Sequence, residues 1–318
     1  MESNIKLSFI IVSYNEKEYI EDCINSIFSM DLSFGYEIII VDDGSNDGSL
    51  DLIKELSKDS IIKYFVMERP ENLTKENIIP SLRVSNVIKK GIEISSGDYI
   101  MIISADDYYI SKTFVKDAIS YLDEHKEYIA LAGDADKLNC KYDYFNYPNW
   151  LFWANHYIYI TNWVVRNNND FKKTLKLNLL DDTGYFYNIL TLGKIVYKNG
   201  PVFEYRQRDD SITHKNDELE TKLVEYLLYQ DIIDNGDKLH FSGLKRYGYL
   251  FLDLYHDRLK IQDIKYKKYF DYLRNNKNNK LNKYFKSSPY YRVLYIIFLR
   301  IFVNIMNFIT KIYEKYRK

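Results

Sequence analysis

Short apolar runs rich in β-branched residues alternate with amphipathic stretches over the first 125 residues of the chain. Leu7 to Ser13 forms the first such run, and apolar residues then recur at helical spacing between Glu18 and Met30. Strands that alternate with helices indicate βαβ units, in which a parallel sheet has helices on both faces. The pattern therefore predicts an α/β fold with strands at 7–13, 36–41, 61–67 and 99–103, and helices at 18–30, 49–58, 83–95 and 113–125.

Polar clusters follow three of the predicted strands at the point where each strand ends. They are Ser13-Tyr-Asn-Glu16, Asp42-Asp43 and Asp106-Asp107. The carboxyl ends of parallel strands meet at one edge of a sheet, and ligands of open α/β sheets bind beyond that edge. We therefore expect the three clusters to outline a single binding site.

The turn after the first strand, Ser13-Tyr-Asn-Glu-Lys17, has no glycine, and the chain carries neither a dinucleotide-binding fingerprint nor a P-loop. Carboxylates repel a diphosphate unless a divalent cation lies between them. Mg²⁺ and Mn²⁺ take oxygen ligands and are often held by one or two carboxylates together with substrate phosphates. The pair Asp106-Asp107 suits that role, and the alternative is that the pair caps the following helix.

Six segments, in their order and spacing, resemble the inverting GT-A glycosyltransferases of glycosyltransferase family 2. The resemblance implies a GT-A fold, which is a Rossmann-like, mostly parallel sheet with helices on both faces, here followed by a C-terminal helical extension. It also implies transfer of a sugar from a nucleotide-sugar donor. The segments are Ser8 to Asn15, Val41 to Ser45, Gly91 to Ile100, Ser104 to Asp107, Asp181-Asp182 and Tyr205-Arg206.

The resemblance assigns roles to individual residues at the donor site. Asp43 resembles the acidic residue that hydrogen-bonds the uracil ring, and Asp107 resembles the ligand of an Mn²⁺ or Mg²⁺ ion bound to the diphosphate. Arg83 resembles a basic residue that meets the phosphates, although a surface helix charge is the alternative. The residues assigned to the nucleotide are Val12, Ser13, Tyr14, Asp43, Arg83 and Asp106.

Asp182 matches the catalytic base of the family, which takes the proton of the acceptor hydroxyl. Asp181 is the alternative base, and capping of a helix is the structural alternative for both. Two positions depart from the family pattern. Ser104 replaces the first acidic residue of the metal motif, and Arg208 stands where a histidine is frequent. His214 lies nearby and is interpreted as a surface residue.

Beyond residue 125 the pattern is less regular. It predicts a helix at 178–192, strands at 193–197 and 201–206, and helices from residue 218 onward. The aromatic stretch from Tyr142 to Trp163 is interpreted equally as an acceptor platform or as core. The expected domains are a catalytic domain at 1–215, with a nucleotide-sugar half at 1–107 and an acceptor half at 108–215, a helical extension at 216–288 and an amphipathic helix at 289–318.

The net charge of −1 conceals an asymmetry between the two ends of the chain. Residues 258–318 contain 16 Lys and Arg against three acidic residues, so they carry +13. Their apolar run at 293–299 favours an interfacial helix on anionic lipid over a partner nucleic acid. With no disulfide framework and no signal peptide, we expect a cytoplasmic protein at the inner face of the cell membrane.

These features predict a glycosyltransferase that uses a UDP-sugar and a glycan or polyprenyl-linked glycan acceptor of the bacterial cell envelope. A nucleotidyltransferase is the alternative enzyme, but it would want a Gly-rich, basic loop after the first strand. A catalytically inactive carbohydrate- or membrane-binding protein is the second alternative, which Ser104 favours and Asp107 opposes. The sequence leaves open whether the chain forms a homo-oligomer.

Overall fold

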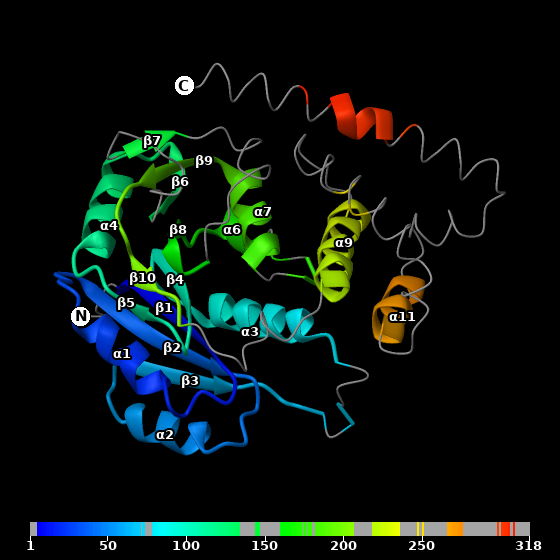
Figure 1. Ribbon diagram of the computed structural model, residues 1–318. Coiled ribbons are helices and arrows are strands. Elements are labelled where there is room, and N and C mark those ends of the chain that lie inside the picture. The colour runs from blue at the N-terminus through cyan, green and yellow to red at the C-terminus, as the bar shows by residue number, and fades with distance from the viewer. Residues whose placement is uncertain are drawn as a thin grey trace. The chain divides into compact units, whose positions relative to one another are not determined.

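The computed structural model forms two compact units, one of Met1–Asn72, Ser81–Tyr147 and His156–Arg208, the other of Leu73–Pro80, Pro148–Asn155 and Asp209–Lys318. Figure 1 shows the elements of both units. The structure describes residues 5–70, 72–73, 78–133, 144–146, 160–173, 175, 177–179, 182–206, 218–235, 247, 250, 266–275, 298, 300–305 and 308.

An eight-stranded sheet forms the centre of the first unit. The pairs β3–β2, β2–β1, β1–β4 and β6–β9 are parallel, which confirms the expected mostly parallel α/β sheet. Across the sheet the strands are β3 (Ile62–Val66), β2 (Gly35–Asp42), β1 (Ile5–Ser13), β4 (Tyr99–Ser104), β8 (Trp163–Arg166), β6 (Tyr128–Ala132), β9 (Lys194–Lys198) and β7 (Tyr144–Asn146).

The strand β8 was not predicted, and it runs antiparallel to both β4 and β6. Its four residues are too few to show a periodic pattern in the sequence. Trp163 opens the strand, is fully buried and packs edge-to-face on Tyr197 at 6.1 Å between ring centroids. For Trp163 the core interpretation is therefore confirmed, whereas Trp150 and Trp153 lie outside the described residues.

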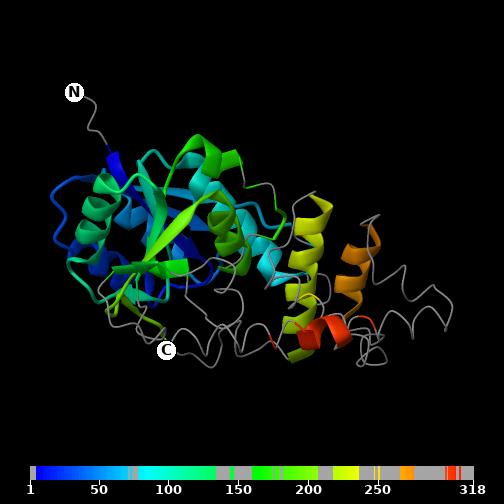
Figure 2. The same cartoon turned by 90° about the horizontal axis from the view of Figure 1, so that it is seen from above.

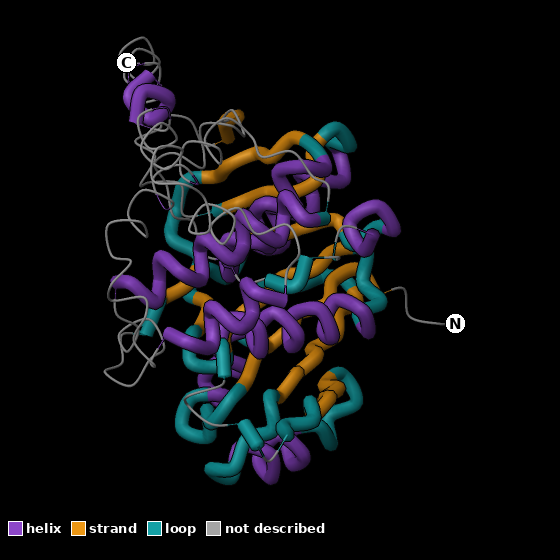
Figure 3. Tube along the Cα trace, turned by 90° about the vertical axis from the view of Figure 1, so that its right-hand side faces the viewer, coloured by secondary structure: helices purple, strands orange, loops and turns teal. Residues whose placement is uncertain are grey.

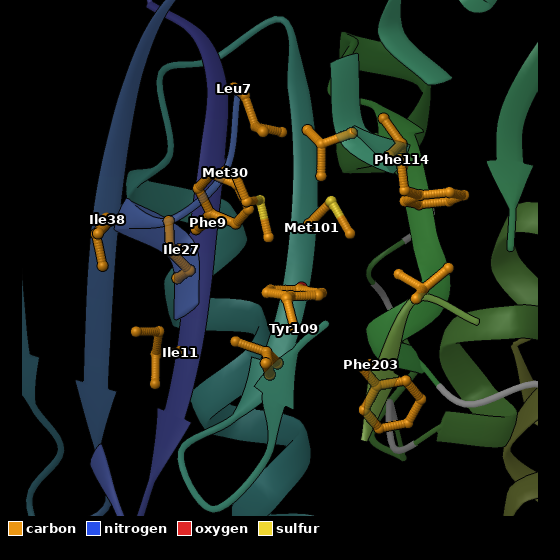
Figure 4. Close-up of a cluster of buried hydrophobic side chains, with 14 of the residues drawn as sticks. Leu7, Phe9, Ile11, Ile27, Met30, Ile38, Met101, Tyr109, Phe114 and Phe203 are labelled. Carbon is orange, nitrogen blue, oxygen red and sulfur yellow. The ribbon is translucent and has the colours of Figure 1, made fainter. Parts of the chain in front are cut away.

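Alternate residues of each strand point to opposite faces of the sheet. Both faces carry apolar side chains, and helices cover both of them. Leu7, Phe9 and Ile11 share one cluster with side chains of α1 (Ile20–Phe28), α2 (Ser49–Leu56) and α4 (Phe114–Glu124), as Figure 4 shows in part. Ile39 and Val41 face the other side, where Val87 of α3 (Pro80–Ile94) packs on them. In Figure 3 the strands form a twisted layer flanked by helices.

Two glycines explain how closely the chain packs on β1. A Cβ atom at Gly91 of α3 would clash with the side chain of Ile10, so the helix approaches the sheet only with glycine there. Gly97 follows the end of α3 and lies against β1, where a Cβ atom would come within 2.6 Å of the Ser8 backbone nitrogen.

A second, two-stranded sheet pairs β5 (Tyr108–Tyr109) with β10 (Phe203–Glu204) in antiparallel register. Tyr109 and Phe203 belong to the main hydrophobic cluster, so the small sheet is anchored in the core. The strand expected at 201–206 is shortened to β10. The helix expected at 178–192 is α7 (Asp182–Leu192), and it follows a 3₁₀ turn, η2 (Ile160–Asn162), and α6 (Asn169–Lys173).

In the second unit α9 (Glu218–Asp234) and α11 (Lys267–Asn275) lie side by side, as Figures 1 and 2 both show. The buried Glu220 carboxylate accepts a hydrogen bond from the Tyr269 hydroxyl at 2.9 Å and pairs with Lys268 at 3.0 Å. These helices agree with the expected helical region from residue 218 onward. No helix within the described residues has the length and apolar character needed to cross a membrane.

Candidate active site

The carboxyl ends of β1, β2 and β4 meet at one edge of the sheet, as the sequence predicts. The Asp43 amide donates a hydrogen bond to the Ser13 carbonyl at 2.9 Å, and the Ala105 amide donates to the Val12 carbonyl at 2.9 Å. Strand register agrees, since Val12 lies opposite both Val41 and Ser104. The turns after all three strands are therefore neighbours.

Asp42 ties the first two turns together. Its buried carboxylate accepts hydrogen bonds from the Ser13 hydroxyl at 3.0 Å, the Ser45 amide at 2.7 Å and the Ser45 hydroxyl at 2.6 Å. Asn15 has a left-handed backbone with φ of 57°, which Asn tolerates better than most residues. Its side-chain oxygen accepts from the Asn46 amide at 2.9 Å. The turns are thus preorganised by contacts between them.

Asp43 is nearly buried, and two arginines hold its carboxylate. Arg69 donates to Asp43 at 2.6 Å, while Arg83 donates through both Nε, at 3.2 Å, and a terminal nitrogen. Arg83 also donates to the Glu68 carbonyl at 3.0 Å. The alternative of a solvated surface charge does not describe Arg83, because its side chain is mostly buried in this cluster.

Arg69 is a site residue that the sequence analysis missed. Its guanidinium lies 4.0 Å from the centroid of the Tyr14 ring, which is partly exposed. A cation over an aromatic face is an attractive arrangement. Arg69 follows β3 by three residues, and β3 is parallel to β2, so its position at a strand end was a signal for the same edge.

Ser104, Asp106 and Asp107 form the turn after β4. The Ser104 hydroxyl donates to the Asp106 carboxylate at 2.5 Å, and the Asp107 amide donates to the Ser104 carbonyl at 3.0 Å. The residue that departs from the family pattern therefore fixes the orientation of Asp106. Asp107 itself is nearly buried, so its carboxylate lies in a sheltered part of the edge.

The small sheet brings Tyr205-Arg206 beside this turn. The backbone amide of Arg206 donates to the Asp107 carboxylate at 3.1 Å, and the side-chain Nε of Arg206 donates to the Asp106 carbonyl at 2.9 Å. The guanidinium also pairs with Asp22 of α1 at 3.2 Å. Residues that are about 100 positions apart in the sequence thus meet at one turn.

The N-terminus of α7 carries the expected base. Asp182 is the first residue of the helix, and Tyr185 follows it by one helical turn. The pKa of the buried Tyr109 hydroxyl is raised well above its usual value by burial, and Cys23, Asp107 and Tyr185 add to the rise. Asp181, Arg208 and His214 are outside the described residues, and so is the side chain of Asp182.

The donor chemistry of the edge fits a divalent cation held mainly by a ligand's phosphates. Within the described residues no three His, Cys, Asp or Glu side chains gather into a metal-binding group. Asp107 supplies one sheltered carboxylate, and Mg²⁺ or Mn²⁺ is commonly bound through one or two carboxylates plus substrate phosphates. The residues present therefore suit an ion that arrives with a nucleotide diphosphate.

Residues 8–188 match the family described as glycosyl transferase family 2, which is more than half of the 318-residue chain. The chain belongs to glycosyl transferase family 2. This match confirms the family and the enzyme class, a glycosyltransferase, that the sequence indicates.

Two relatives show what kinds of glycosyltransferase resemble this chain. Poly(ribitol-phosphate) beta-N-acetylglucosaminyltransferase TarS of Staphylococcus aureus is 29% identical over 128 residues, which are 40% of this chain and 20% of that protein. Poly(ribitol-phosphate) beta-glucosyltransferase of Bacillus spizizenii is 31% identical over 119 residues, which are 35% of this chain and 16% of that protein. The chain thus matches a fifth or less of the length of these two relatives.

A solved structure shows the fold. The crystal structure of S. aureus TarS 1–349 in complex with UDP-GlcNAc superposes with a TM-score of 0.60 at 15% identity, covering 98% of this chain and 92% of that chain. The GT-A-like fold expected from the sequence is therefore confirmed.

Proposed function

We propose that the chain is a metal-dependent, inverting glycosyltransferase that moves a sugar from a UDP-sugar to a glycan acceptor. The observation that carries the proposal is the gathering of Asp43, with its two arginines, and Asp107 at one edge of a family 2 sheet. TarS, a relative and a structural neighbour, binds UDP-GlcNAc, which supports a UDP-linked donor.

The nucleotide lies in this proposal over the turns after β1 and β2. Val12, Ser13 and Tyr14 contact the base and ribose, and Asp43 accepts a hydrogen bond from the uracil ring. The arginines that hold Asp43 fix the direction of its carboxylate before the nucleotide binds. Arg83 belongs to this cluster, and its guanidinium fork is also well suited to binding the phosphates.

Asp106 and Asp107 complete the donor site. Ser104 orients Asp106 toward a role at the ribose, and Asp107 holds the divalent ion. When bound, Mg²⁺ or Mn²⁺ would neutralise the charge that develops on the departing diphosphate. The Arg206 amide fixes the Asp107 carboxylate, and its guanidinium braces the Asp106 backbone.

Asp182 is the proposed base. Its carboxylate takes the proton of the acceptor hydroxyl, whose oxygen attacks the anomeric carbon in line while the bond to UDP breaks. One displacement inverts the anomeric configuration. The position of Asp182 as the first residue of α7 supports this role. Asp181 is the alternative base.

The chain from residue 108 onward is proposed to serve the acceptor. Residues 1–107 form the nucleotide-sugar half and 108–215 the acceptor half, followed by a helical extension at 216–288 and an amphipathic helix at 289–318. In that last segment Phe298, Ile301, Ile305 and Phe308 are exposed at helical spacing. With the +13 charge of residues 258–318, they support binding to an anionic inner membrane surface and a polyprenyl-linked acceptor.

Co-sedimentation with vesicles tests the membrane contact. Phe298→Asp and Phe308→Asp together should abolish binding to phosphatidylglycerol vesicles, because they place charge in the apolar stripe. Phosphatidylcholine vesicles serve as the uncharged control. Unchanged sedimentation of the double variant with phosphatidylglycerol would refute the membrane role.

Turnover of UDP-GlcNAc with Mn²⁺ tests the enzyme. Asp182→Asn should lower release of UDP about 10²- to 10⁴-fold, as loss of a general base does, while its affinity for UDP is retained. Asp181→Asn is the matched control and should keep most activity. Release of pyrophosphate instead of UDP would identify a nucleotidyltransferase, and absence of any turnover by the wild type with UDP-sugars would overturn the proposal.

A further inference from the structure

An open cleft of about 730 Å³ lies between α1, β5 and β10. Its volume falls in the range of about 300–1,000 Å³ that is typical of small-molecule sites. Among the side chains that line the cleft, only that of Arg206 has a part in the donor site described above. The residues that line it are Asp22, Asn25, Ser26, Tyr108, Glu204, Tyr205 and Arg206.

Hydrogen bonds connect the elements that form the walls of the cleft. The Ser26 hydroxyl accepts a hydrogen bond from the Tyr109 amide at 3.0 Å, which ties α1 to β5. Glu204 pairs with Tyr108 across the small sheet. Its carboxylate accepts a hydrogen bond from the Tyr108 hydroxyl, which raises the pKa of that tyrosine. Side chains on packed elements hold a binding geometry better than side chains on loops.

The lining has the chemistry that recognises sugars. Sugar hydroxyls both donate and accept hydrogen bonds, and the cleft offers carboxylate acceptors at Asp22 and Glu204, a guanidinium donor at Arg206 and an amide at Asn25 that does both. The two tyrosines add flat apolar faces with polar tips, which suit the C–H faces of a sugar ring. An apolar ligand would shield these polar groups from water without offering them hydrogen bonds.

The charge of the cleft narrows the class of sugar. Two carboxylates and one guanidinium leave one net negative charge, so a phosphodiester polymer would be repelled. The expected ligand therefore differs from the poly(ribitol-phosphate) that appears in the names of two relatives. A neutral saccharide is the ligand that matches both the hydrogen-bonding groups and the charge.

Arg206 connects the cleft to the turn after β4. Its guanidinium lies 4.6 Å from the Tyr19 ring centroid and pairs with Asp22, while its backbone holds Asp107. We propose that the cleft between α1, β5 and β10 is a subsite for neutral saccharide units of the acceptor glycan. The subsite rests on the proposed function for its role in the reaction, but its binding of saccharide is measured separately from turnover.

Binding of triacetylchitotriose and maltotriose, followed by NMR titration, tests the subsite. Asn25 is exposed on α1, so Asn25→Trp fills the cleft without removing a core contact. It should weaken binding of the trisaccharides at least tenfold. Glu21→Trp places the same ring on α1 outside the cleft and should bind them as the wild type does. Ribitol 5-phosphate, the charged probe, should bind more weakly than either trisaccharide.

Three results would overturn the subsite: wild-type protein that binds neither trisaccharide, equal binding by Asn25→Trp, or tighter binding of ribitol 5-phosphate than of the trisaccharides. UDP binding and thermal unfolding of each variant show whether the donor site and the fold are intact. Trisaccharide binding without UDP binding or turnover would contradict the proposed function and leave the subsite standing. UDP-sugar turnover without trisaccharide binding would support the proposed function and contradict the subsite.

Discussion

The two edges of the parallel sheet both hold nearly buried carboxylates, but the partners of those carboxylates differ. At the amino edge, Glu37 of β2 accepts hydrogen bonds from the Ser8 hydroxyl at 2.6 Å and from the Ser96 amide at 2.8 Å. At the carboxyl edge of the same strand, Asp43 is held by two arginine side chains. The amino-edge carboxylate has two serines and one lysine, Lys63, as partners, whereas both partners of the carboxyl-edge carboxylate are arginine side chains.

The pKa of Glu37 reflects its role at the amino edge. Burial alone would raise this pKa, but hydrogen bonds from Lys63, Ser8 and Ser96 outweigh burial and hold it below its usual value. The ionised carboxylate therefore joins β1, β2 and the turn after α3. Loss of a scaffold carboxylate should cost stability, whereas loss of a carboxyl-edge residue should cost ligand binding.

Glu37→Ala should give the largest change in stability. It removes the shared acceptor of Ser8 and Ser96 and leaves the buried Ser8 hydroxyl without that acceptor, which we expect to cost about 1–3 kcal/mol of unfolding free energy. Urea denaturation measures the loss, and UDP affinity of the folded variant should stay as in the wild type. Glu93→Ala, an exposed acid on α3, is the control and should change stability by less than about 0.5 kcal/mol. Equal losses in the two variants would erase the distinction between the edges.

Arg69→Ala and Arg83→Ala should show the opposite behaviour. Each leaves Asp43 with one arginine, so the carboxylate is less well oriented, and we expect UDP to bind about tenfold more weakly, or about 1.4 kcal/mol. Isothermal titration calorimetry measures this change. Lys90→Ala removes another cation of α3 that lies over Phe65, and it should leave UDP affinity unchanged. If the arginine variants lost stability but kept full UDP affinity, the carboxyl edge would be scaffold too.

Asp123→Asn should give the smallest effect and a pH dependence. Partial burial would raise the pKa of Asp123, but hydrogen bonds from Lys6, Tyr99 and Lys126 lower it to about 2. Its stabilisation is thus complete above the unfolded pKa of about 4 and is lost as pH falls toward 2. The side chain is 36% exposed, so we expect at most about 1 kcal/mol at neutral pH.

Thermal unfolding of wild type and Asp123→Asn between pH 7 and pH 2 measures this dependence. The difference in melting temperature should shrink as the pH falls below about 4, because the wild-type carboxylate becomes protonated. A difference that stays constant with pH would show that the ion pairs of Asp123 contribute nothing to stability.

The sequence predicts the first half of the fold well, because its strands are Ile-rich runs between amphipathic helices and each ends in a polar turn. It also predicts that Asp43 and Asp107 lie at one edge. It missed β8, a four-residue strand that enters the sheet antiparallel. A short strand placed by non-local pairing leaves little periodic signal.

The partners of the site residues were harder to predict than their positions. The role of Arg83 at the phosphates stays a prediction, and its contact with Asp43 was not predicted. Arg206 was recognised as part of a motif, but its contacts with Asp22 and Asp107 depend on the pairing of β5 with β10. Such contacts arise from tertiary packing, which a single sequence does not reveal.

The most direct test of the account is the affinity for UDP with and without Mn²⁺, measured by calorimetry for wild type, Asp107→Asn and Asp182→Asn. Asp107 is proposed to hold the ion that binds the diphosphate, whereas Asp182 acts only on the acceptor. Mn²⁺ should therefore tighten UDP binding in the wild type and in Asp182→Asn, and this gain should disappear in Asp107→Asn. A full Mn²⁺ gain in Asp107→Asn, or no gain in the wild type, would contradict the account.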